Sequence, residues 1–191
     1  LLVSSFMDRL PEGLAEFADE LTFEIVSDDR AAVKHTLPVI LANSQPDYCV
    51  FTGQAPGYNS IKLENLATNY QFTGPPPEPG ADPPGEPVEP DGPVAYRASL
   101  PAMSEMITSM RQAGIPAAMS CYGGNSRCNQ ILYQGLHYAV TNGLAMQCGF
   151  MHIPALPQQV IERWPKHPFM PLDMSRTALQ IIIESLHQQT K

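Results

Sequence analysis

The sequence has few positive charges and no long apolar run. Of its 191 residues, 11 are Lys or Arg and 19 are Asp or Glu, so the formal net charge is −8. Nucleic acids and anionic membrane surfaces attract clustered Lys and Arg. A membrane-spanning helix needs about 20 consecutive apolar residues, and no run in this chain approaches that length. We therefore expect neither a nucleic acid nor a membrane as partner.

Cysteine is also scarce. Four cysteines are too few for a disulfide scaffold in a chain of this size, so we interpret them as reduced thiols and the protein as cytoplasmic. The apolar residues 1–6 are too short for a signal peptide and lack a basic flank. No His forms a zinc-like pair with another His or Cys. We expect no metal and no cofactor.

Apolar periodicity alternates between strand-like and helix-like segments. Short apolar runs predict strands at residues 1–6, 21–26, 47–53, 115–120 and 150–154. Helical spacing predicts helices at residues 8–20, 29–43, 101–113, 128–142 and 175–189. Pro38 predicts a kink or an early end in the second of these helices. This alternation indicates an α/β layered domain with a largely parallel sheet.

In such sheets the chemistry lies at the carboxyl ends of the strands. The loops after Phe51, after Met119 and around His152 follow predicted strands. We expect the functional residues on these three loops.

Residues 74–93 form a proline-rich segment. Nine of its twenty residues are proline, and its only charged residues are acidic. Such a segment excludes a helix or a central strand and favours an extended excursion. One interpretation is a solvated surface loop. The other is a ligand for an SH3-type domain, which the absence of Lys and Arg weakens.

Cys128 is a candidate nucleophile because it lies where a helix is predicted to begin. Asn125 or Ser126 can cap that helix, and the positive end of the helix dipole favours a thiolate. The alternative is an inert buried cysteine. Cys121 is a rival that lacks the helix start, and Cys49 is most simply a core residue.

His152 and Glu64 gain significance only in combination with a thiol. A lone His in a short apolar strand is usually structural, but pairing with a Cys activates such nucleophiles. Glu64 alone says little. It matters if a His needs an orienting partner, as in catalytic triads.

Four ordered segments between Pro46 and Pro157 resemble the pyroglutamyl peptidase I (pyrrolidone-carboxylate peptidase) family of cysteine peptidases. The family motifs and their counterparts here are G-Q-A-G-G-R-x-x-I-x-x-E-R at 53–65, D-G-P-x-A-Y-x-S-T-L-P at 91–101, G-I-P-A-x-x-S-N-T-A-G-T-x-x-C-N at 114–129 and G-F-x-H-x-P at 149–154.

The resemblance implies Cys128 as nucleophile, His152 as general base and Glu64 as the residue that orients it. It also implies that Gln54 lines the site. For the fold, it implies a single α/β/α sandwich domain over residues 1–191, with a twisted, mostly parallel sheet and often a homo-oligomeric assembly. The expected substrate is an N-terminal pyroglutamyl peptide or a related small N-acyl amide.

The expected substrate pocket departs from the family pattern. In the family, a G-F-E-P-F-G-G loop lines the pocket. Here Phe6 matches the first aromatic residue of that loop, and Arg9 stands where the second aromatic residue would be. Arg9 could pair with a substrate carboxylate. Ser126 stands where an aromatic would help to sandwich the lactam ring, and its neighbour Arg127 is also expected to contact substrate. These changes put specificity in question more than chemistry. The alternative in another class is a non-catalytic homologue that acts as a binding or interaction protein.

Overall fold

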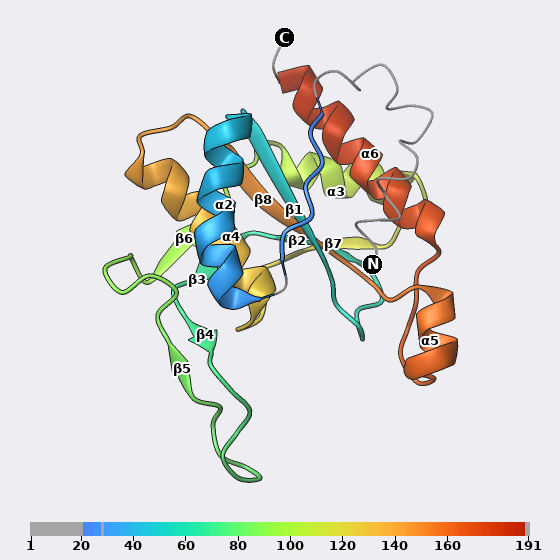
Figure 1. The fold of residues 1–191 in the computed structure, drawn as a ribbon. Helices are drawn as coiled ribbons and strands as arrows, with labels where there is room; N and C mark the ends of the chain where they lie inside the picture. The colour runs from blue at the N-terminus through green and yellow to red at the C-terminus, as the bar shows by residue number, and fades with distance from the viewer. Residues whose placement is uncertain (1–20, 28, 190–191) are drawn as a thin grey trace.

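The computed structural model describes residues 21–27 and 29–189 (Figure 1). In chain order the elements are α2 (Arg30–Ser44), β1 (Tyr48–Gln54), β2 (Ile61–Glu64), β3 (Leu66–Thr68), β4 (Gln71–Phe72), β5 (Gly85–Glu86), β6 (Ala95–Arg97), α3 (Met103–Gln112), β7 (Ala117–Ser120), α4 (Arg127–Thr141), β8 (Gln147–Ile153), α5 (Pro157–Arg163) and α6 (Leu172–Gln189).

The central sheet has four strands in the order β1-β8-β2-β7. β1 pairs with β8 and β2 pairs with β7 in parallel, whereas β2 and β8 are antiparallel. The sheet is therefore mostly parallel, as predicted. Two short antiparallel pairs, β3 with β6 and β4 with β5, lie outside it.

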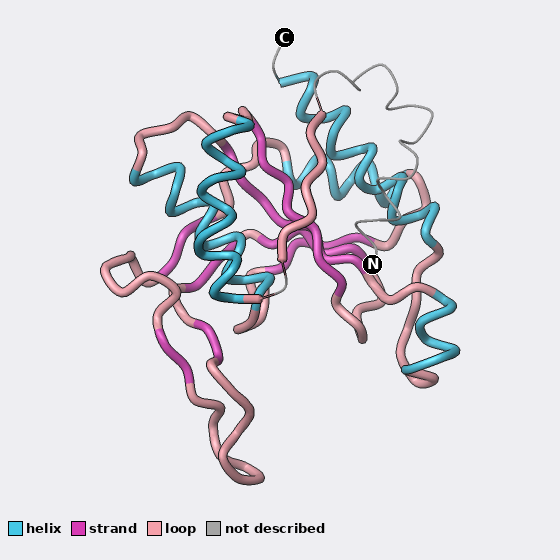
Figure 2. The backbone as a smooth tube through the Cα atoms, in the orientation of Figure 1, coloured by secondary structure: helices cyan, strands magenta, loops and turns pink. Residues whose placement is uncertain are grey.

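Helices cover both faces of this sheet. Figure 1 shows α2 and α4 on one side of the strands and α3 and α6 on the other, and Figure 2 shows the strands crossing between them. Each face has its own apolar cluster. Phe51 and Phe150 belong to the cluster of α2 and α4, whereas Leu63 and Met151 belong to the cluster of α3 and α6. The predicted single α/β/α sandwich is confirmed.

The apolar stripes of the helices explain this packing. In α3 four apolar residues on one face are buried, namely Met103, Met106, Ile107 and Met110. In α6, Leu179, Ile182 and Leu186 are buried three and four residues apart. Residues at these spacings share one helix face, so each stripe docks on the sheet as a unit.

Helix α2 begins where the sequence predicts and ends later. The Asp29 carboxylate accepts a hydrogen bond from the Ala32 N–H at 2.9 Å and caps the first turn. The helix continues past Pro38 to Ser44, so the predicted early end is wrong. Leu37 and Leu41 are buried on either side of the proline, and their packing offsets the loss of one backbone hydrogen bond.

Other predicted segments differ from the structure or lie outside the described residues. Residues 21–26 form no strand, because no neighbouring strand pairs with their backbone in the described structure. The strand predicted at 150–154 begins earlier, at Gln147, and is buried from Cys148 onward. The segments predicted at residues 1–6 and 8–20, with Phe6 and Arg9, lie outside the described residues.

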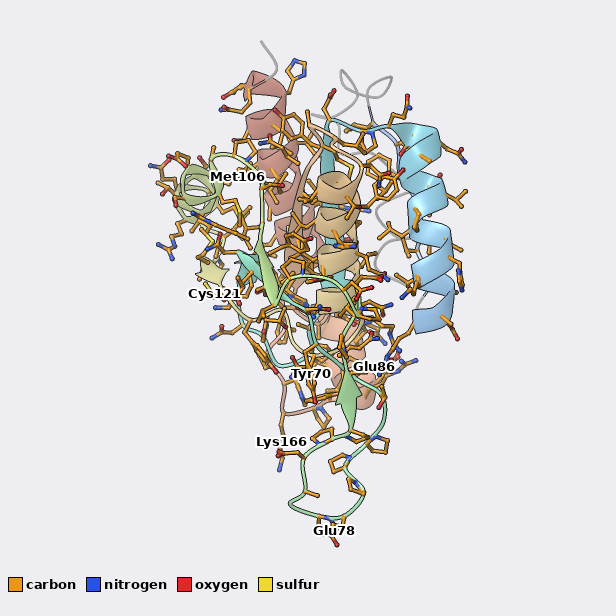
Figure 3. The ribbon with its side chains drawn as sticks, turned by 90° about the vertical axis from the view of Figure 1, so that its left-hand side faces the viewer. Tyr70, Glu78, Glu86, Met106, Cys121 and Lys166 are labelled. Atoms are coloured by element: carbon orange, nitrogen blue, oxygen red, sulfur yellow. The ribbon has the colours of Figure 1, made fainter. Side chains whose placement is uncertain are left out.

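The proline-rich segment forms an arm rather than a free loop. β4 and β5 pair near its base, and Figure 3 shows Glu78 at its far tip, remote from the sheet. The Asn69 amide donates to the carbonyls of Glu89 at 2.7 Å and Gly92 at 3.0 Å. Val88 is buried in the cluster of α2 and α4. The segment contains no helix, as expected, but its tip closes in a turn in which the Ala81 N–H donates to the Glu78 carbonyl at 3.1 Å, while the return segment packs against the domain.

Within the described ranges, no helix is long and apolar enough to cross a membrane.

Gly135 allows α4 to lie close to β1. A Cβ at this position would lie 2.7 Å from Phe51 Cε2, which is shorter than van der Waals contact. We expect Gly135→Ala to lower the free energy of unfolding by about 1–3 kcal/mol, because the helix must shift off the sheet. The measurement is chemical denaturation.

The matched control is Gly74→Ala, where the nearest atom would be 3.6 Å away. Its effect should stay within about 0.5 kcal/mol. Because alanine in a helix interior is favoured over glycine by about 1 kcal/mol, a stabilised Gly135→Ala protein would refute close packing at this point.

Candidate active site

Strand alternation directs three positions toward α4. Gly53 of β1 is the register partner of His152 in β8. Lys62 of β2 is also opposite His152, so Glu64 lies diagonally from it on the same face. Phe150, which points the same way, packs in the cluster of α2 and α4. Gly53, Glu64 and His152 therefore share the sheet face that α4 covers.

The antiparallel pairing of β2 and β8 corrects one expectation. The carboxyl ends of β1 and β8 coincide, but Glu64 and Ser120, the last residues of β2 and β7, lie level with Phe150. The loop after β7 therefore leaves in the opposite direction to the loops after β1 and β8. The candidate residues meet on a face of the sheet and not at one common carboxyl edge.

His152 and Glu64 form a buried hydrogen-bonded pair. Nδ1 of His152 lies 2.8 Å from Oε1 of Glu64, and the two residues are 4% and 0% exposed. An ionised carboxylate only accepts hydrogen bonds, so Nδ1–H is the donor and Nε2 is left for another partner. The other carboxylate oxygen, Oε2 of Glu64, has no hydrogen-bond partner among the described residues.

Cys128 lies in the first turn of α4, as predicted, because the helix begins at Arg127. Ser126 is the N-cap residue, but its side chain makes no capping hydrogen bond. A Cβ at Gly53 would lie 3.0 Å from the Cys128 Sγ and 2.8 Å from Phe150 Cζ. Only glycine at position 53 therefore leaves room for the thiol beside His152.

Electrostatics link the thiol, the imidazole and the carboxylate. Burial by itself lowers the pKa of His152, because it disfavours the imidazolium. Hydrogen bonding to Cys128 and to Glu64, together with their negative charges, outweighs burial and raises the pKa of His152 to about 9. His152 therefore keeps its proton through neutral pH when the thiol and carboxylate are ionised.

The other three cysteines lie in different settings. Cys49 and Cys148 are register partners on β1 and β8. A hydrogen bond with Cys49, and burial, raise the pKa of the Cys148 thiol, which makes it a poor nucleophile. Cys121 is exposed at the end of β7 (Figure 3), and its sulfur lies 4.0 Å from the Asn65 amide nitrogen. Cys128 is the thiol that interacts with His152.

Two aromatic rings that the sequence analysis did not single out pack against His152. The ring centroid of Phe150 lies 4.6 Å from that of His152, and the centroid of Tyr58 lies 5.6 Å away in an edge-to-face arrangement. Phe150 was detectable, because it precedes His152 by two residues and so shares its strand face. Tyr58 was not, because it lies on a loop with no periodic signal.

The predicted substrate-contacting residues are not all brought together. Gln54 follows Gly53 in β1, so its side chain is directed to the opposite face, where it accepts a hydrogen bond from Gln159 of α5 at 3.2 Å. The expectation that Gln54 lines the site stays a prediction. Ser126 and Arg127 immediately precede Cys128 at the start of α4.

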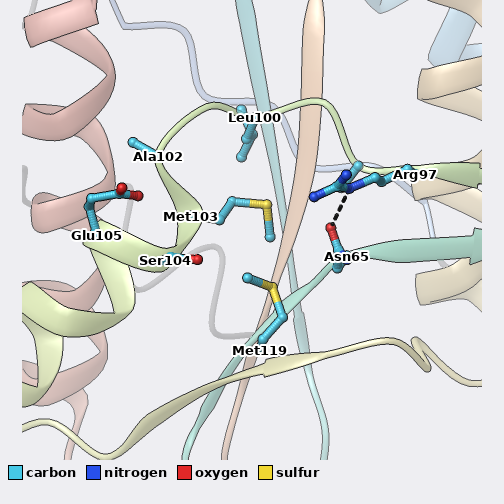
Figure 4. Close-up of a pocket in the computed structure, with 9 residues that line it drawn as sticks. Asn65, Arg97, Leu100, Ala102, Met103, Ser104, Glu105 and Met119 are labelled. Atoms are coloured by element: carbon cyan, nitrogen blue, oxygen red, sulfur yellow. Dashed lines mark hydrogen bonds between the residues drawn. The ribbon is translucent and has the colours of Figure 1, made fainter.

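A cavity of about 370 Å³ lies near the start of α3 (Figure 4). Asn65, Arg97, Met103 and Met119 are among its lining residues, and Arg97 Nε donates to the Asn65 side-chain oxygen at 3.3 Å. Neither Cys128 nor His152 lines it. Among the residues described, no group of three or more His, Cys, Asp or Glu side chains could hold a metal ion.

Comparison with known proteins identifies the family of this chain. The family model of pyroglutamyl peptidase matches residues 17–189. Pyrrolidone-carboxylate peptidase 1 of Caldanaerobacter subterraneus subsp. tengcongensis is 36% identical over 145 residues, covering 74% of this chain and 70% of the relative. Pyrrolidone-carboxylate peptidase of Thermococcus onnurineus is 32% identical over 177 residues, covering 93% and 86%.

Solved structures show the same similarity in three dimensions. The crystal structure of pyrrolidone carboxyl peptidase from the hyperthermophile Pyrococcus furiosus superimposes with a TM-score of 0.77 at 29% identity, covering 86% of this chain and 80% of that one. The chain therefore belongs to the pyroglutamyl peptidase family.

Proposed function

We propose that this protein is a cysteine peptidase that removes an N-terminal pyroglutamyl group from peptides, with Cys128 as nucleophile, His152 as general base and Glu64 as its orienting partner. The observation that carries the proposal is the buried His152–Glu64 hydrogen bond beside a thiol in the first turn of a helix. The names of the relatives support the choice of substrate.

The chemistry follows the positions of these groups. Before the reaction, Nε2 of His152 holds the proton that the Cys128 thiol has given up, and the thiolate sulfur attacks the amide carbonyl of the substrate. The tetrahedral intermediate collapses to a thioester as His152 returns the proton to the leaving amine. Water, deprotonated by His152, then hydrolyses the thioester and releases pyroglutamate. Glu64 holds Nδ1–H and so keeps Nε2 available throughout.

The start of α4 supplies the groups for the developing oxyanion. The first N–H groups of a helix have no intrahelical partner, and the Ser126 side chain does not occupy them. Removing one such hydrogen-bond donor from an oxyanion hole raises the activation free energy by about 3–4 kcal/mol. Position and helix dipole together favour negative charge at this point.

A purely non-catalytic role fits the site less well. Burying an ionised carboxylate with one unpaired oxygen costs stability, and Glu64 is fully buried with Oε2 unpaired in the described structure. A protein that only bound a partner would gain nothing from keeping this arrangement next to a thiol. The alternative of a binding homologue is therefore not favoured.

Replacing the nucleophile should abolish the reaction. We expect Cys128→Ala to release no pyroglutamate from pyroglutamyl-aminomethylcoumarin above the uncatalysed rate, because no thioester can form. Fluorescence of the released coumarin measures this. Cys121→Ala is the matched control, since Cys121 is exposed and contacts Asn65, and it should keep most of the activity. Unchanged turnover in Cys128→Ala would refute the assignment.

The pH dependence should report on His152. Because the folded pKa of His152 is about 9, kcat/KM should fall as the pH rises through 9, where the imidazole loses the proton that the leaving amine needs. Stopped assays between pH 5 and 10.5 measure this limb. A constant rate from pH 8 to 10.5 would contradict it.

Glu64→Gln should move this limb in a defined direction. The carboxylate raises the pKa of His152, so its loss lowers that pKa and shifts the alkaline limb to lower pH. We also expect kcat to fall by about a hundred- to ten-thousandfold. Glu105→Gln, at an exposed position on α3, is the control and should change neither quantity.

A further inference from the structure

Tyr58 is held over the site by a tight turn. The Tyr58 N–H donates to the Ala55 carbonyl at 3.1 Å, and Gly57 has a φ of +102°. Proline at the second position and a left-handed glycine at the third are the requirements of a type II turn, which Pro56 and Gly57 meet. The Ala55 N–H donates in turn to the Ile153 carbonyl at 2.9 Å. The loop is thus anchored to the end of β8, one residue beyond His152.

The Tyr58 ring packs against the His152 imidazole. It meets the imidazole edge-to-face at an interplanar angle of 74°. His152 is only 4% exposed, whereas Tyr58 is half-buried. Tyr58 therefore packs on the imidazole and still presents part of its own ring to solvent.

A second tyrosine lies close to the first. Tyr122, in the loop between β7 and α4, is 59% exposed. Burial raises the pKa of Tyr58, and the charges of Glu64, Tyr122 and Cys128 raise it further. The same loop continues through Gly123, where a Cβ would lie 3.8 Å from Cγ of Glu64. Tyr58 thus packs on the imidazole, and Tyr122 lies on a loop whose next residue approaches Glu64.

The reaction determines which part of the substrate lies next to the rings of Tyr58 and Tyr122. His152 gives its proton to the leaving amine, so the nitrogen of the residue after the scissile bond must come within hydrogen-bond reach of Nε2. The ring that packs on the imidazole is that of Tyr58. Tyr58 is therefore the candidate for contact with the first residue of the released peptide.

We propose that Tyr58 and Tyr122 form the subsite for the first residue of the released peptide, and that they favour an aromatic or large apolar side chain there. The proposal rests on the function proposed above. Neither tyrosine belongs to the family motifs, which have R at the position of Tyr58 and T at that of Tyr122. An aromatic side chain gains from ring pairing beyond its buried area, and a large apolar side chain gains from buried area alone.

The test compares substrates that differ only in this residue. The kcat/KM values of pyroglutamyl-phenylalanine amide and pyroglutamyl-glycine amide are measured by chromatography of released pyroglutamate. We expect wild type to prefer the phenylalanine substrate, and Tyr58→Ala to reduce this preference about tenfold, mainly through KM. Tyr58→Phe should retain the preference, because the ring remains.

Two further variants separate a subsite from a general disturbance. Tyr122→Ala should also reduce the preference, mainly by raising KM for the phenylalanine substrate. Tyr138→Ala is the matched control. It lies ten residues along α4 from Cys128, about 15 Å at 1.5 Å per residue, and should leave the preference unchanged.

Binding provides a readout that does not need turnover. In the Cys128→Ala background, calorimetry should show Tyr58→Ala weakening the affinity for pyroglutamyl-phenylalanine amide about tenfold, with that for the glycine compound unchanged. If wild type hydrolyses neither compound but this binding pattern appears, the proposed peptidase function fails and the subsite stands.

The opposite result overturns the subsite. If Tyr58→Ala lowers kcat equally for both substrates and shifts the alkaline limb of the pH profile, Tyr58 only positions His152. If neither tyrosine variant changes the preference or the binding, these rings do not contact the released peptide.

Discussion

Glu64 and His152 come from strands that run in opposite directions, and the hydrogen bond between them joins two side chains that water does not reach. Removing one partner of such a buried pair leaves the other uncompensated, which costs about 3–5 kcal/mol. The pair therefore constrains the register of β2 against β8. It also fixes the imidazole so that Nε2 is turned toward Cys128, and the raised pKa of His152 follows from the same contacts.

Close approach of α4 to the sheet is the second requirement, and glycine meets it. Gly53 lies under the Cys128 sulfur, and Gly135 lies against the Phe51 ring. A side chain at either position would push the first turn of α4 away from His152. The Asn129 side chain, one residue after Cys128, binds the backbone of Thr68 and Tyr70 through both its oxygen and its nitrogen. The helix start is thus held from two directions.

Elements with a strong repeating pattern were predictable. The methionine stripe of α3, the Asp29 cap of α2 and the position of Cys128 in the first turn of α4 all follow from local periodicity and capping. Prediction failed where the structure of a segment depends on residues that are distant in the sequence. Residues 21–26 have a strand-like pattern but no paired neighbour, and α2 passes through Pro38 because buried leucines flank it. No strand was predicted at β2, since four residues are too few to show a pattern.

The amino-acid sequence by itself determined the α/β class, the family and the three residues proposed for catalysis, because hydrophobic periodicity and ordered motifs are properties of the chain alone. Only the tertiary structure decided how these residues meet. The direction of β2 relative to β8 depends on strand pairing between segments about ninety residues apart in the chain, which local preferences do not encode. The same strand pairing directs the Gln54 side chain to the sheet face opposite that of Gly53, and it leaves Tyr58 beside His152. Contacts across a folded sheet depend on the register of its strands and not on the order of residues along the chain.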